Sequence, residues 1–155
     1  DIVKQDTHMT EEMREAFLGH FEESRANSLV GFCVTGGIFS EGIDLRRDRL
    51  IGVMVVGTGL PQVCTEREIL KEYYDEKEKK GFDFAYRFPG MNKVLQAAGR
   101  LIRTMDDRGI ILLLDDRFLT REYVEQFPME WDDYLPVRMD TVGEKIREFW
   151  KNQME

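Results

Sequence analysis

The chain has 155 residues, of which 42% are hydrophobic, and this is enough for one sizeable core and one compact unit. Its formal net charge of −8 excludes a surface devoted to holding nucleic acid through clustered Lys and Arg, so any such contact must be local. Its two cysteines lack metal-ligand spacing, and no apolar run reaches the ~18 residues of a membrane span, so a reduced, cytoplasmic protein is expected.

The first third of the chain alternates strand and helix patterns. Residues 1–4 resemble the C-terminal end of a strand that begins earlier, so we expect the chain to be a piece of a longer polypeptide. A helix is predicted over residues 10–21. Thr10 is expected to cap it, and Glu11 and Glu12 lie in its first turn. Apolar runs at 28–34 and 50–56 predict two buried strands, and Cys33 is expected in the core.

The segment between those two strands, residues 39–45, reads F-S-E-G-I-D-L. Gly42 permits a sharp turn or a close approach of the backbone to a ligand. Glu41 and Asp44 are three residues apart and can accept hydrogen bonds from a ribose or orient arginines across a cleft. A capped turn, in which Ser40 and Asp44 satisfy free backbone donors, is a simpler interpretation that is compatible with the first.

A charged helix is predicted over residues 66–80, ending before Gly81. The aromatic-rich segment 82–89 follows it. Such a cluster can stack nucleic-acid bases, although a plug over the core is its commoner role. Asn92 is then predicted to cap the next helix.

That helix carries the polar stripe of the chain. Gln96, Arg100 and Arg103 occupy positions i, i+4 and i+7, which on a helix fall within an arc of about 60°. The apolar residues expected to pack on a sheet from the other side are Val94, Leu95, Ala98, Leu101, Ile102 and Met105. Two guanidiniums offer planar forks of donors that suit a phosphate, whereas a solvated basic face is the alternative that spacing alone leaves open.

The strand predicted at 110–114 ends in acidic residues and looks like a Walker B strand, whose carboxylates hold Mg²⁺. The sequence has no G-x-x-x-x-G-K-[ST] phosphate loop, so we predict no metal site. Asp115 and Arg117 are instead expected to form a hydrogen-bonded network that supports the arginine helix. Helices are predicted over 121–127 and 142–153, and the alternation of strands and helices implies an α/β fold with parallel pairing.

The blocks at 39–45 and 96–109 resemble motifs V and VI of superfamily 2 helicases of the XPD/DinG type, in the family's order. The second block matches Q-x-x-G-R-x-I-R-x-x-x-D-x-G. The resemblance implies that residues 1–155 are one RecA-like domain, a parallel sheet flanked by helices. It further implies the second, C-terminal motor domain of an ATP-dependent DNA helicase that acts in DNA repair.

The same resemblance implies roles for individual residues. Arg100 and Arg103 are expected to be arginine fingers for ATP hydrolysis, with Gln96 positioning the γ-phosphate or the attacking water. Nucleotide binding is expected of Glu41, Gly42, Asp44 and Gly99. A supporting role is expected of Asp107, Asp115 and Arg117. Contacts with single-stranded DNA are expected of Thr35, Gly36 and Ser40.

ATP and Mg²⁺ are expected to be held mainly by a first motor domain outside this sequence, so the isolated chain is predicted to be inactive. The expected partners are ATP, single-stranded DNA and that first domain. An iron–sulfur cluster, where the family has one, is held by cysteines of the first domain. Two alternatives remain open: a non-catalytic nucleic-acid or protein binding module derived from a helicase, and a small α/β enzyme that uses Arg100 and Arg103 as a phosphate clamp.

Overall fold

The computed structural model describes residues 1–22, 27–37, 39, 50–102, 104 and 106–153. The chain divides into two compact units, Asp1–Asp115 and Asp116–Glu155, whereas the sequence predicted a single one. The assignment of residues 1–155 to one motor domain therefore stays a prediction. No helix in the described part of the chain is long and apolar enough to cross a membrane.

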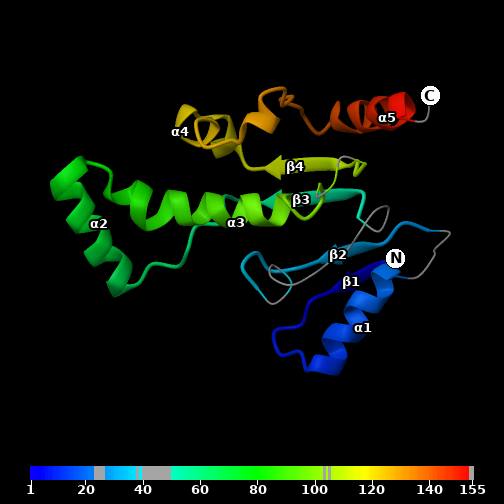
Figure 1. Ribbon diagram of the computed structural model, residues 1–155, viewed down its shortest axis with the longest axis horizontal. Coiled ribbons are helices and arrows are strands. Elements are labelled where there is room, and N and C mark those ends of the chain that lie inside the picture. The colour runs from blue at the N-terminus through cyan, green and yellow to red at the C-terminus, as the bar shows by residue number, and fades with distance from the viewer. Residues whose placement is uncertain (23–26, 38, 40–49, 103, 105, 154–155) are drawn as a thin grey trace. The chain divides into compact units, whose positions relative to one another are not determined.

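The first unit contains two parallel strand pairs, as the α/β prediction required (Figure 1). β1 (Ile2–Lys4) pairs with β2 (Val30–Phe32). β3 (Gly52–Val56) pairs with β4 (Ile110–Leu114). The registers place Ile2 opposite Val30 and Gly52 opposite Ile110.

The first strand pair packs against α1 (Glu11–Glu22), the helix that the sequence predicted over 10–21. Phe17 of this helix is buried and stacks on Phe39, with the ring centroids 4.3 Å apart. The expectation that β2 and its neighbours are buried was wrong, because Phe32 is 56% exposed and Cys33 is also exposed. A sheet of two strands has too little area to bury both faces.

The charged helix predicted over residues 66–80 is α2 (Thr65–Glu78). It ends at Lys79, which adopts a left-handed conformation with φ 59°. The amide of Gly81 then donates to Oδ1 of Asp75 at 2.7 Å. Only glycine fits there, since a Cβ at Gly81 would lie 2.1 Å from the carbonyl oxygen of Lys71.

The chain after this turn is helical again. A π-helical turn, η2 (Asp83–Arg87), runs directly into α3 (Phe88–Ala98). Asn92 therefore lies inside α3, and the prediction that it caps the helix was wrong. Pro89 is the second residue after the π-helical turn, so its missing amide donor falls where the backbone pattern changes from η2 to α3.

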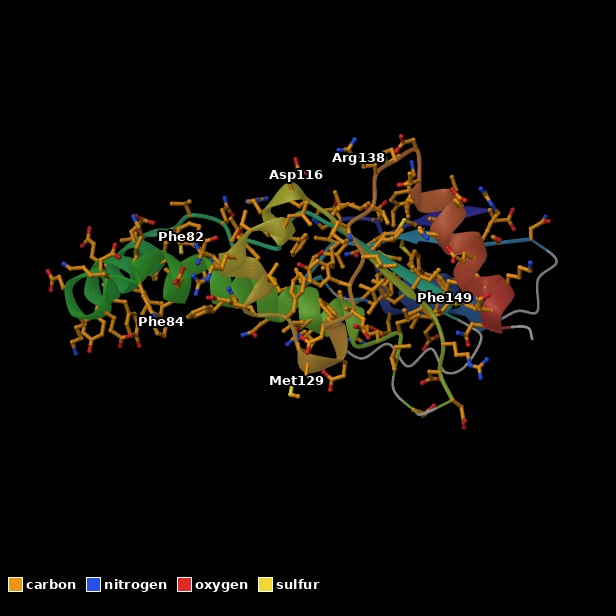
Figure 2. All side chains as sticks on the ribbon, turned by 90° about the horizontal axis from the view of Figure 1, so that it is seen from above. Phe82, Phe84, Asp116, Met129, Arg138 and Phe149 are labelled. Atoms are coloured by element: carbon orange, nitrogen blue, oxygen red, sulfur yellow. The ribbon has the colours of Figure 1, made fainter. Side chains whose placement is uncertain are left out.

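Aromatic side chains join η2 to α2, and Figure 2 labels two of them, Phe82 and Phe84. Phe84 stacks on Tyr74 with ring centroids 4.1 Å apart, and Phe82 stacks on Tyr86 at 5.5 Å. The Tyr86 hydroxyl donates a hydrogen bond to the Glu68 carboxylate, which raises the pKa of Tyr86 to about 12. The aromatic segment thus packs two helical pieces together.

α3 packs on β3, where Val55 is buried. The buried residues of the helix are Gly90, Met91, Val94 and Ala98. The helix and the turn after β3 also approach each other through the main chain. A Cβ built at Gly90 would lie 2.6 Å from the carbonyl oxygen of Thr58, and one built at Gly59 would lie 2.8 Å from the carbonyl oxygen of Gly90.

The second unit consists of short helices and one longer one. They are η3 (Asp116–Leu119), α4 (Arg121–Val124), η4 (Met129–Trp131) and α5 (Val142–Gln153). The last has the predicted bounds, whereas the helix predicted over 121–127 ends earlier, because the residue before Pro128 disfavours helical geometry. Phe127 contacts both Trp131 and Tyr134, with ring centroids 5.3 and 5.4 Å away.

Candidate functional site

The predicted arginine helix ends sooner than the sequence suggested. α3 stops at Ala98, and the chain continues as a tight turn through i to i+3 bonds. The amide of Arg100 donates to the carbonyl of Ala97 at 3.4 Å, and the amide of Leu101 donates to that of Ala98 at 3.0 Å. Bonds of this kind tighten the last turn of a helix, and Gly99 has a low helix propensity. Arg100 therefore lies in a turn beyond the helix.

This turn is anchored by Leu101, which is buried. A Cβ built at Gly109 would lie 2.6 Å from Cδ1 of Leu101, so the leucine side chain occupies the space that glycine leaves at the start of β4. The predicted burial of Val94, Ala98 and Leu101 is confirmed. The predicted burial of Ile102 was wrong, since it is 46% exposed just past the anchor. Met105 lies outside the described residues.

Asp107 closes the connection between this turn and β4. Its Oδ2 accepts a hydrogen bond from the amide of Thr104 at 2.7 Å, and its own amide donates to the Thr104 carbonyl at 3.3 Å. The carboxylate therefore closes the turn from Thr104 to Asp107 just before β4, and its support of Arg100 stays a prediction.

The other two predicted supporting residues belong to different units. Asp115 directly follows β4 and is the last residue of the first unit. Arg117 lies in η3, where the Thr120 amide donates to its carbonyl at 3.0 Å. The network predicted between Asp115 and Arg117 stays a prediction. No group of three or more His, Cys, Asp or Glu among the described residues is arranged to hold a metal ion.

A second element of the candidate site is the turn that follows β2. The amide of Gly37 donates to the carbonyl of Val34 at 2.9 Å, and Gly36 has φ +78°, as the third residue of a type II turn requires. Oε1 of Gln5 accepts a hydrogen bond from the amide of Val34 at 2.9 Å. Thr35 and Gly36, which are predicted to contact nucleic acid, thus lie on a turn that is hydrogen-bonded to Gln5, the residue after β1.

The structure brings this turn against α3 through a residue that the sequence analysis missed. A Cβ built at Gly36 would lie 3.3 Å from Cε, 3.4 Å from Cδ and 3.5 Å from Nζ of Lys93. Lys93 lies three residues before Gln96, which is exposed, and the two share a face of α3. Its position on the Gln96 stripe was the signal in the sequence that could have identified it.

The remaining predicted site residues lie outside the described part of the chain. They are Ser40, Glu41, Gly42, Asp44 and Arg103. Phe39, the first residue of the 39–45 block, is described and is buried against Phe17 of α1. The start of that block is therefore attached to the core of the first unit.

Residues 1–134 match the sequence profile of the helicase C-terminal domain family. The chain is 30% identical over 130 residues to a Caenorhabditis elegans protein named regulator of telomere elongation helicase 1 homolog, covering 78% of this chain and 13% of that protein. It is 32% identical over 107 residues to an Escherichia coli (strain K12) protein named ATP-dependent DNA helicase YoaA, covering 67% of this chain and 16% of that protein.

Among solved structures, one described as an XPD helicase resembles the chain with a TM-score of 0.54 and 23% sequence identity. The superposition covers 80% of this chain and 26% of that one. It confirms the predicted fold class. The chain thus spans only a small part of the length of each of these similar proteins.

Proposed function

Because the chain belongs to the helicase C-terminal domain family of XPD/DinG-type helicases, we propose that it is the second RecA-like motor domain of an ATP-dependent DNA helicase. In this proposal Arg100 is an arginine finger that contacts the γ-phosphate of ATP. The observation that most directly supports it is the position of Arg100. It lies two residues past a helix that is packed on β3, in a turn anchored by the buried Leu101.

Such anchoring matters for the chemistry. An arginine finger stabilises charge that develops on the phosphoryl group, and it does so best when its position is fixed before the reaction begins. A turn held by a buried leucine meets this requirement better than a mobile loop. Gln96, on the exposed face of the same helix, positions the phosphate or the attacking water, and Arg103 supplies the second guanidinium.

The nucleotide itself is held mainly by a first motor domain. The sequence has no phosphate loop, and no cluster of potential metal ligands is found among the described residues, so the triphosphate and Mg²⁺ need donors from elsewhere. The nucleotide-binding role that the family resemblance implies for Glu41, Gly42, Asp44 and Gly99 is part of this proposal. Thr35, Gly36 and Ser40 contribute to the track of the single strand.

The test is the Arg100→Ala substitution in the complete protein, with ATP hydrolysis measured with and without single-stranded DNA. We expect DNA-stimulated turnover to fall about a thousandfold or more, because the developing charge loses its stabiliser. Arg121→Ala is the matched control, since Arg121 is exposed on α4 of the second unit and pairs with Glu125. Equal turnover of the Arg100 variant and the unaltered protein would refute the assignment.

A second measurement separates this proposal from the alternatives. The isolated chain is expected to hydrolyse no ATP, because it contributes only one side of the catalytic cleft. Turnover of a small phosphorylated compound by the isolated chain would instead favour the free-standing enzyme that uses its arginines as a clamp. Strand binding by the complete protein without any hydrolysis would favour the non-catalytic module.

A further inference from the structure

The charge of Lys93 is not neutralised within the described part of the chain, where no ion pair or hydrogen bond reaches its ammonium group. The residue is half-buried, and its carbon stem lies over Gly36. Ordering a lysine stem costs side-chain entropy, so a cation held in this way without a counter-charge among the described residues suggests a binding role.

The position of Lys93 distinguishes it from Arg100. Seven residues separate the two in sequence, and Lys93 lies inside α3 whereas Arg100 lies in the turn beyond it. We assign the two cations to different phosphates because the Lys93 side chain contacts the turn at Gly36. The side chain of Lys93 packs against the turn formed by Val34 to Gly37, whereas Arg100 lies beyond the C-terminal end of α3.

We propose that Lys93 binds a backbone phosphate of the single strand, in a site formed by its ammonium group and the turn at Thr35 and Gly36. This inference rests on the proposed function and extends it to a residue outside the motif that suggested it. Gly36 is part of the site because its bare Cα admits the lysine stem, and its φ of +78° favours glycine.

The overall charge of the protein supports a strand contact of this limited kind. A net charge of −8 leaves no broad basic surface, so binding depends on a few cations placed where the strand passes. Lys93 is such a cation, and its contact with Gly36 connects the strand site to the helix that leads to Arg100. Binding of a strand phosphate by Lys93 therefore acts directly on the position of α3.

The experiment compares Lys93→Met with the unaltered complete protein. Methionine keeps an apolar stem over Gly36 and removes only the charge. Binding of a fluorescein-labelled oligothymidylate is followed by anisotropy between roughly 50 and 200 mM salt. We expect the affinity to fall roughly fivefold and the slope of log affinity against log salt to decrease by about 0.7, the value for one phosphate contact on a single strand.

Two controls accompany this measurement. Lys80→Met removes the same charge from an exposed lysine after α2 and is expected to keep the salt slope of the unaltered protein. Lys93→Arg keeps the charge and is expected to retain most of the affinity. Thermal unfolding of each variant shows whether the fold is intact.

The possible results are distinguishable. An unchanged salt slope for Lys93→Met, in a protein whose ATP hydrolysis is stimulated by single-stranded DNA, overturns the strand site alone and leaves the motor proposal standing. A raised KM for ATP with unchanged strand affinity assigns Lys93 to the nucleotide and also overturns it. Absence of any strand-stimulated hydrolysis in the unaltered protein overturns the motor proposal and this inference together.

Discussion

The main-chain contact between α3 and the turn after β3 predicts that Gly90→Ala destabilises the protein. A Cβ at this position would lie 2.6 Å from the Thr58 carbonyl oxygen and 3.2 Å from the Leu60 amide nitrogen. Both neighbours are backbone atoms, so no flexible side chain can move aside. Overpacking of this kind costs typically about 1–3 kcal/mol, and the short distance places Gly90 in the upper part of that range.

The substitution also has a favourable effect that must be subtracted. Alanine is favoured over glycine inside a helix by about 1 kcal/mol, so the net loss in the free energy of unfolding is about 1–2 kcal/mol. For a protein of this size, each kcal/mol corresponds to roughly 2–4 °C in Tm. We therefore expect the Tm of Gly90→Ala, measured by circular dichroism, to fall by roughly 5 °C.

Gly19→Ala is the matched control for this prediction. Gly19 lies inside α1, and a Cβ built there meets nothing within 4 Å. The same substitution should therefore raise the free energy of unfolding by about 0.5–1 kcal/mol through helix propensity alone. If Gly90→Ala stabilises the protein as much as Gly19→Ala does, the close approach of α3 and the turn after β3 is wrong.

Two further predictions concern buried polar groups. The neutral Tyr86 hydroxyl donates to Glu68, and its pKa is raised to about 12, so the stabilisation it provides is complete below pH 10 and is lost as the pH rises through 12. An absorbance titration of tyrosinate should show one group titrating last, and that late step should be missing in Tyr86→Phe; a uniform transition near pH 10 would contradict this. Thr58 is buried, and its hydroxyl has no hydrogen-bond partner among the described residues, so Thr58→Val should raise the free energy of unfolding by about 1 kcal/mol in chemical denaturation. A loss of stability in that variant would show that the Thr58 hydroxyl makes a stabilising hydrogen bond.

Much of the first unit was predictable from local patterns. The strand at 110–114 and the charged helix near 66–80 follow from unbroken runs of apolar or helix-forming residues, and both appear close to their expected positions. Parallel pairing followed from the alternation of strands with helices. These features depend on residues near one another in sequence, which is why periodicity identifies them.

The errors arose where distant residues decide the structure. Cys33 lies in an apolar run that looks buried, but its burial depends on how many strands join the sheet, which the run does not encode. The end of α3 at Ala98 depends on Leu101 reaching Gly109 across a turn. Asn92 was predicted as a cap because asparagine is a favoured N-cap residue, whereas the helix begins at Phe88.

The candidate site shows the same division. Motif spacing made Gln96 and Arg100 candidates, a role that stays a prediction, but it gave no sign that Lys93 lies over Gly36. That contact joins residues almost sixty positions apart and needs a glycine with a positive φ, neither of which is visible in a local pattern. Sequence reasoning therefore finds residues that recur in a motif more readily than residues that meet only in the fold.

The contact between Gly59 and Gly90 has a mechanical consequence. Where two backbones touch with no side chain between them, no compliant layer can absorb a small displacement, because a packed interior resists compression. A shift at the end of β3 is therefore expected to move the start of α3 with it. If the chain is the motor domain proposed above, this contact is a rigid link between its sheet and the helix that leads to Arg100.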